Sequence, residues 1–222
     1  MGIHLYCITP ANTQLPPVRQ TGIGGSPLLS VTSGDLAALV SLHATPPAAA
    51  LDAIRVHNEV IAAAMDDHVT PVPIRFGQWL IDEDAVRAAL DEGAARWSGM
   101  LGRFAGCAEF AIRIFDPALP DAKETPRPRT GRAYMEALAA RAAVPAARHE
   151  EAVGALGEVM QGLHTEVLTE PLRTQHGVAS VAYLVHRRDF DAYHTAVERV
   201  RMHMPHLRYL STGPWPPYSF VS

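Results

Sequence analysis

Two apolar periodicities alternate along this chain, and they limit the folds that it can adopt. Residues 107–115 carry apolar side chains at every second position, which is the period of a half-buried strand. Residues 48–67, 149–171 and 190–200 carry them three and four positions apart, which is the period of an amphipathic helix. Strands and helices that share one chain in this way predict an α+β protein.

The first half is predicted to begin with strands and to end with helices. Its expected elements are a strand at 3–9, a hairpin of strands at 28–32 and 36–42, a helix at 48–67, a half-buried strand at 72–76, and one helix that starts at 82–84 and ends at 102–106. The segment 36–42 also suits a short helix capped by Asp35, so both interpretations of it stay open.

The second half is predicted to contain a β-α-β unit after two helices. Its expected elements are a strand at 107–115, a linker at 116–129, a helix from Thr130 that Pro145 interrupts, a helix at 149–171, a strand at 178–186, a helix from Phe190 to Pro205 and a strand at 207–211. This order predicts a mixed α/β N-terminal domain at 1–105 and a ferredoxin-like C-terminal domain at 106–222 with an added helical hairpin.

Charge and the character of the N-terminal segment exclude several function classes. The net charge of −4 argues against general nucleic-acid binding, which requires a basic surface for the phosphates. The first ten residues resemble no secretory signal, and no apolar run approaches the roughly 20 residues that span a bilayer. Cys7 and Cys107 stand alone, which indicates two buried free thiols. We therefore expect a cytoplasmic, soluble protein that binds neither membranes nor nucleic acid.

Histidine and glycine patterns give weak indications of ligand sites. Met202–His206 holds two histidines, but Pro205 breaks the helix between them and no third ligand lies nearby in the sequence. The glycines of residues 21–27 lack the lysine and the helix that a phosphate loop needs. We therefore predict no metal, no cofactor and no catalytic residues.

A possible functional cluster is His57 and Glu59 on one predicted helix, with Arg75 and Phe76 on the next strand. A catalytic interpretation makes His57 a general base beside Glu59 or Arg75, acting on a small anionic substrate. Positions 57 and 59 point to different sides of a helix, however, which argues against a close pair. A structural hydrogen bond or ion pair between helix and strand is the favoured interpretation.

The C-terminal tail GPWPPYSFV is the most unusual segment. Its prolines fix φ and favour an extended path, while Trp215, Tyr218 and Phe220 carry large apolar surfaces. Such a tail either docks on its own protein or binds a partner. Docking on its own protein is the favoured prediction, because an exposed apolar segment promotes aggregation, and the first half could supply the dock.

Several of these motifs together resemble the gas vesicle protein F/L family. They are HNE at 57–59, PVPIRFG at 71–77, GRAY at 131–134 with Arg132 and Tyr134, AYLV at 182–185 and TGPWPPYSFV at 212–221. The resemblance runs over nearly the whole chain and does not distinguish an F-like from an L-like member. It implies a non-enzymatic two-domain α+β protein, without a cofactor, that is needed for gas vesicle formation.

The resemblance also implies partners and a location. The partners are the small hydrophobic gas vesicle shell protein and other gas vesicle accessory proteins, and the location is the cytoplasm or the vesicle wall, its gas-facing side included. We expect the sheet with Val72, Ile74 and Phe76 to form the binding surface, with Arg75 and Trp215 holding the tail and the domains in place. The alternatives are a small-anion enzyme that uses His57 and Arg75, and a generic peptide-binding module.

Overall fold

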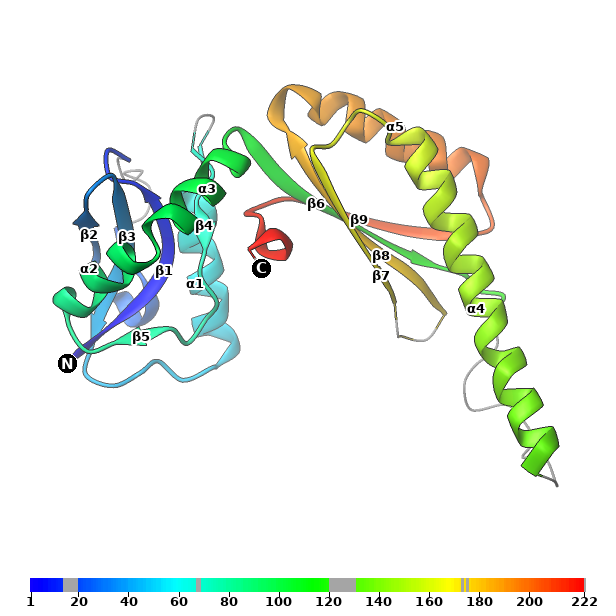
Figure 1. Cartoon of the computed structure of the whole chain (residues 1–222), viewed down its shortest axis with the longest axis horizontal. Helices are drawn as coiled ribbons and strands as arrows, with labels where there is room; N and C mark the ends of the chain where they lie inside the picture. The colour runs from blue at the N-terminus through cyan, green and yellow to red at the C-terminus, as the bar shows by residue number, and fades with distance from the viewer. Residues whose placement is uncertain (14–19, 67–68, 120–130, 173, 175, 222) are drawn as a thin grey trace. The chain divides into compact units, whose positions relative to one another are not determined.

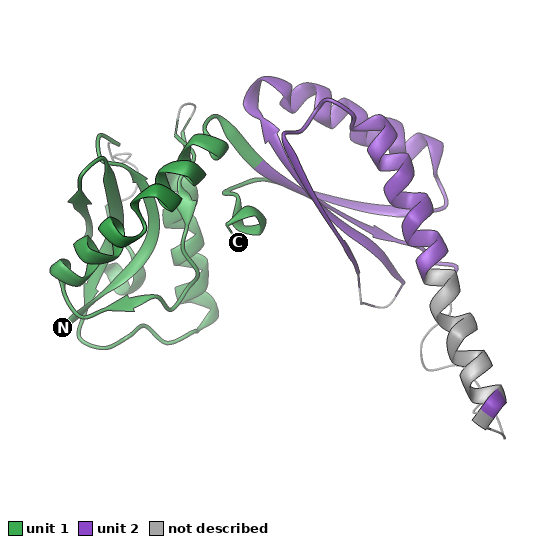
Figure 2. Ribbon diagram, viewed as in Figure 1, with its two compact units in different colours: residues 1–108, 214–222 green, residues 109–213 purple. Residues whose placement is uncertain are grey.

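The computed structural model describes the chain except residues 14–19, 67–68, 120–130, 173, 175 and 222, and Arg132 is the one side chain described within 131–145. The chain forms two compact units (Figure 2). Unit 1 comprises residues 1–108 and 214–222, and unit 2 comprises residues 109–213. The last residues therefore belong to unit 1 although they follow unit 2 in the sequence.

Unit 1 is built on a five-stranded sheet in the order β2-β3-β1-β4, with β5 also paired to β1. Its strands are β1 (Gly2–Pro10), β2 (Leu28–Ser33), β3 (Leu36–His43), β4 (Val72–Pro73) and β5 (Trp79–Leu80). All of these pairs are antiparallel. The predicted hairpin is confirmed as β2 and β3, and the helical alternative for 36–42 is wrong. This segment is a strand because Leu36 to Val40 are all buried, whereas a helix this short has one buried face.

Helices pack against both faces of this sheet (Figure 1). Helix α1 (Leu51–Ala63) packs with Tyr6, Cys7 and Leu39 on one face. Helices α2 (Glu83–Glu92) and α3 (Ala94–Phe104) contact β1, β2 and β3 from the other face. A short 3-10 helix, η1 (Ile23–Gly25), contacts α1. The central strand β1 is therefore buried almost along its whole length.

Two predicted elements of unit 1 are shorter than expected. The predicted strand 72–76 is wrong beyond β4, because the chain turns at Phe76 and Gly77, where Gly77 has φ of 94°. The predicted single helix from 82–84 to 102–106 is also wrong, because Gly93 separates α2 from α3. Gly93 has φ of −92° and ψ of 7°, and a Cβ there would collide with the indole of Trp97.

Unit 2 contains most of a four-stranded sheet in the order β7-β8-β6-β9. Its elements are β6 (Cys107–Phe115), α4 (Gly131–Val159), β7 (Glu166–Pro171), β8 (Gly177–His186), η2 (Arg187–Asp189), α5 (Phe190–His203) and β9 (Arg208–Trp215). Helices α4 and α5 contact each other and β8, so both cover one face of the sheet. Phe110, Leu156 and Tyr193 are fully buried in the apolar core between helices and sheet.

The structure corrects two predictions for unit 2. The predicted helical hairpin is one helix, α4, which continues through Pro145. A proline inside a helix removes one backbone hydrogen bond and so costs free energy. The packing of Ala152, Leu156 and Met160 into the apolar core offsets this cost. The predicted helix 149–171 ends at Val159, and its last part is β7, which pairs antiparallel with β8. The predicted linker 116–129 lies mostly outside the described residues.

Candidate functional site

A pair of buried histidines joins α1 to the sheet of unit 1. His57 of α1 and His4 of β1 are 1% and 0% exposed. Nε2 of His57 donates to the carbonyl oxygen of Ile74 at 2.9 Å, so its Nδ1 is free to accept. Nε2 of His4 then donates to this Nδ1 at 2.9 Å. The favoured sequence interpretation of His57, a structural hydrogen bond between helix and strand, is confirmed.

Aromatic rings and hydroxyl groups surround this pair. The Phe76 ring lies 5.3 Å from that of His4 and 5.5 Å from that of His57. The Tyr6 ring lies 5.3 Å from that of His57 and is stacked on it. The Tyr6 hydroxyl bonds to Ser41, accepts from the backbone N–H of Ile23, and thereby joins the loop after β1 to the sheet.

The burial of these histidines opposes their protonation. Burial lowers the pKa of His4 to about 4, and the charges that His57 and His43 can carry lower it further in the same direction. Burial also lowers the pKa of His57, against the opposing effect of its bond to Ile74. The Nδ1 atom of His4 is buried without a hydrogen-bond partner among the described residues, so a proton there has no acceptor.

The same geometry removes the basis for catalysis by His57. Both of its ring nitrogens are engaged, and the ring is inaccessible to a bound molecule. Glu59 does not pair with His57 but bonds to Arg55 one helical turn away, at 2.6 Å. The structure therefore gives no support to the small-anion enzyme that was the alternative interpretation.

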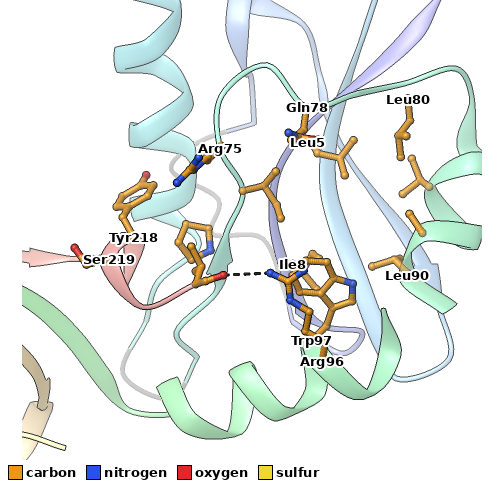
Figure 3. A pocket seen from close by; sticks show the side chains of 15 residues that line it. Leu5, Ile8, Arg75, Gln78, Leu80, Leu90, Arg96, Trp97, Tyr218 and Ser219 are labelled. Carbon is orange, nitrogen blue, oxygen red and sulfur yellow. Dashed lines mark hydrogen bonds between the residues drawn. The ribbon is translucent and has the colours of Figure 1, made fainter. Parts of the chain in front are cut away.

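A groove of about 570 Å³ lies on the other face of the sheet, between β1, the segment 73–80, and helices α2 and α3 (Figure 3). Its floor is apolar, since Leu5, Ile8 and Leu90 are buried there. Its mouth carries exposed side chains, among them Arg75 and Arg96. Among the described residues that line it, none is acidic. The groove therefore combines an apolar floor with a positively charged mouth.

The C-terminal tail forms one wall of this groove. Its last turn, η3 (Tyr218–Phe220), contributes Tyr218 to the lining, and Phe220 is 2% exposed. The Tyr218 hydroxyl donates to Oδ1 of Asn58 at 2.9 Å. The guanidinium of Arg96 donates to the carbonyl oxygen of Val221 at 3.2 Å. The prediction that the tail docks on the first half of the chain is confirmed.

The remaining predicted site residues lie apart from this groove or outside the description. Trp215, at the end of β9, is 47% exposed and is not part of the groove lining. Arg132 is exposed near the start of α4, and the side chain of Tyr134 lies outside the described residues. Val72 is fully buried, so it cannot contact a partner, whereas Ile74 lines the groove. The proposed role of Arg75 and Trp215 in holding the domains stays a prediction.

The sequence interpretation missed four residues that build the site. They are His4, Asn58, Arg96 and Trp97. Asn58 lies inside the HNE motif next to His57, so its place in that motif was the available signal. Nothing in the local sequence distinguishes Arg96 from the other exposed arginines.

The described residues show neither a metal cluster nor a membrane-spanning helix. No group of three or more histidine, cysteine, aspartate or glutamate side chains gathers among them to hold a metal ion. No helix in the described part of the chain has the length and apolar character needed to cross a membrane. Cys7 and Cys107 are both buried and are not joined in a disulfide, as predicted.

Comparisons with known proteins agree over the full length of the chain. The chain is 28% identical over 239 residues to gas vesicle protein F of Streptomyces sp. (strain CB03234), and the match covers 100% of both. It is also 28% identical over 252 residues to gas vesicle protein L of the same organism, covering 98% of this chain and 92% of that protein. The crystal structure of GvpF from Anabaena sp. PCC7120 superimposes with a TM-score of 0.85 at 19% identity, covering 100% and 96%. This last likeness shows a shared fold.

The sequence thus defines a gas vesicle protein. The chain belongs to the family described as "Gas vesicle synthesis protein GvpL/GvpF", whose sequence profile matches residues 2–222. The resemblance inferred from the motifs is confirmed. Membership implies a role in gas vesicle formation, in a family that is not known for enzymes.

Proposed function

We propose that this protein is an assembly factor or minor structural protein of gas vesicles that binds the small hydrophobic shell protein. The observation that carries this proposal is the groove of unit 1, an apolar and solvent-accessible surface in a full-length member of a gas vesicle family. An assembly factor must hold an aggregation-prone subunit without aggregating itself. A concave apolar floor with a charged mouth meets both requirements.

The tail stabilises this surface. Tyr218 and Val221 line the groove while Asn58 and Arg96 hold them by hydrogen bonds. The extended segment before them contains Pro216 and Pro217, which limit the conformations that the tail must give up when it docks. The end of the tail therefore forms a structural wall of the proposed binding surface through Tyr218, Ser219 and Val221.

We infer a two-domain organisation in which unit 2 is a ferredoxin-like domain. The order β6-α4-β7-β8-α5-β9, with the sheet order β7-β8-β6-β9, supports this inference. The first domain would then be residues 1–105 and the second 106–222, with the tail returning to the first. We propose that unit 2 contacts other gas vesicle accessory proteins, in the cytoplasm or at the vesicle wall.

A co-expression pull-down tests the proposed function. The tagged protein is expressed with its host's small shell protein, and with an unrelated apolar peptide of equal length as the control. Selective capture of the shell protein is the expected result. Equal capture of both would instead indicate a generic peptide-binding module, and capture of neither by the folded protein would overturn the proposal.

A further inference from the structure

We propose that the groove of unit 1 binds an apolar segment of the shell protein that carries a carboxylate beside its apolar side chains, with the carboxylate placed between Arg75 and Arg96. This inference rests on the proposed function, because it names the site on this chain and the chemistry that the site recognises.

The size and floor of the groove fix the apolar part of the ligand. A volume of about 570 Å³ lies within the range of about 300–1,000 Å³ typical of built binding sites. Leu5, Ile8, Val86 and Leu90 are each at most 8% exposed and form an apolar floor. Burial of two or three apolar side chains on this floor supplies the main driving force.

The two arginines fix the polar part. The guanidinium of Arg75 has no hydrogen-bond or ion-pair partner among the described residues, and it faces the mouth of the groove. Arg96 lies over the Trp97 ring at 4.7 Å and uses part of its donor capacity on Val221. Each guanidinium therefore keeps N–H donors for an oxygen ligand, and a carboxylate accepts such bonds in pairs.

The openness of the groove favours a peptide over a small molecule. Gln78, Ala89 and Ser219 are exposed around its edge, so the ligand remains in contact with solvent along one side. A polypeptide segment can continue beyond the groove through this open side. The absence of acidic side chains among the described lining residues also selects against cationic segments.

Two pairs of matched variants test the site. Ala89→Glu places a negative charge in the groove, whereas Ala88→Glu places the same charge on an exposed neighbouring position of α2 that does not line it. Arg75→Gln combined with Arg96→Gln removes both positive charges, and Arg208→Gln is the control at an exposed position of unit 2. Amide hydrogen exchange at residues 218–221 checks that the tail stays docked in each variant.

The probe is a set of overlapping synthetic peptides that covers the host's shell protein, measured by fluorescence anisotropy at low and high salt. We expect one acidic apolar peptide to bind, and we expect Ala89→Glu and the double arginine variant each to weaken it about tenfold, with the controls unchanged. Replacing the acidic residue of that peptide by its amide should weaken binding to the wild-type protein by the same factor. It should not change binding to the double arginine variant.

The outcomes separate this proposal from the proposed function. If wild type captures the shell protein and every groove variant, its tail still docked, captures it equally well, the groove proposal is overturned and the function stands. If the acidic and amide peptides bind wild type equally, the carboxylate part is overturned. If wild type captures no shell protein, the proposed function and the site both fail.

Discussion

Unit 1 has helices against both faces of its sheet and a pair of hydrogen-bonded histidines between one helix and the sheet, whereas unit 2 has both of its long helices against one face, packed by aliphatic and aromatic side chains. In unit 1 the buried His4, His57 and Ser41 take part in hydrogen bonds between strands and helix. In unit 2 the core between the helices and the sheet holds Phe110 and Tyr193, whose ring centroids lie 4.6 Å apart.

This difference shows that the two units obtain specificity in different ways. An apolar core tolerates changes of packing as long as volume is kept. A buried hydrogen-bond network tolerates few substitutions, because each buried donor or acceptor left without a partner lowers the stability of the fold. We therefore expect the histidine pair of unit 1 to tolerate fewer substitutions than the apolar packing of unit 2, and unit 1 is also the unit that carries the groove.

The largest expected effect is a loss of stability of unit 1 in acid. His4 has an unfolded pKa of 6.5 and a folded pKa of about 4, so the unfolded state binds more protons between these values. Stability is therefore fully present above pH 6.5 and falls as the pH drops toward 4, by about 3 kcal/mol in total. Hydrogen exchange of β1 and α1 amides from pH 7 to pH 4.5 measures this, with β6 and β8 of unit 2 as the reference.

A His4→Phe variant sharpens the same comparison. It removes the buried titrating ring, so the difference in stability between pH 7 and pH 4.5 shrinks, even if the variant is less stable at pH 7. An unchanged pH dependence in this variant would show that His4 does not cause the acid lability. An equal loss of protection in unit 2 would remove the contrast between the units.

An intermediate change in the free energy of unfolding is expected when a glycine of each unit is replaced by alanine. Gly93→Ala in unit 1 forces a Cβ against Trp97 and should cost about 1–3 kcal/mol. Gly154→Ala in α4 of unit 2 adds a Cβ that meets nothing within 4 Å, and should instead stabilise the helix by about 0.5–1 kcal/mol. Urea denaturation followed by circular dichroism measures both, and effects of the same sign would contradict the prediction.

The smallest change in stability is expected when a tyrosine hydroxyl is removed by substitution with phenylalanine. Tyr218→Phe removes the bond to Asn58 and should cost about 0.5–1 kcal/mol of tail docking, seen as faster exchange of the amides near the C-terminus. Tyr209→Phe in unit 2 removes a buried hydroxyl that has no partner among the described residues, and should be neutral or slightly stabilising. A tail that exchanges at the wild-type rate in Tyr218→Phe would show that this hydrogen bond does not hold it.

Local patterns predicted much of the secondary structure and failed where long-range contacts compete. The strand at 178–186 and the helix after Phe190 follow directly from their periodicity and are present as β8 and α5. The segment that became β7 has helical spacing up to Val167, yet it forms a strand because it pairs with β8. The break at Gly93 was not predicted, because the helical spacing of apolar residues runs on through it, whereas in the structure the Trp97 indole lies where a Cβ of residue 93 would be.

The sequence by itself determined the family, the α+β class and the docking of an aromatic, proline-rich tail. These follow from periodicity, turn residues and motifs that lie within a few positions of each other. Tertiary structure alone decided that His57 bonds to His4, 53 residues away, and that Tyr218 bonds to Asn58, 160 residues away. It also decided that Arg75 and Arg96 share one groove. Such contacts depend on how the sheet places distant segments side by side, and no local pattern encodes that placement.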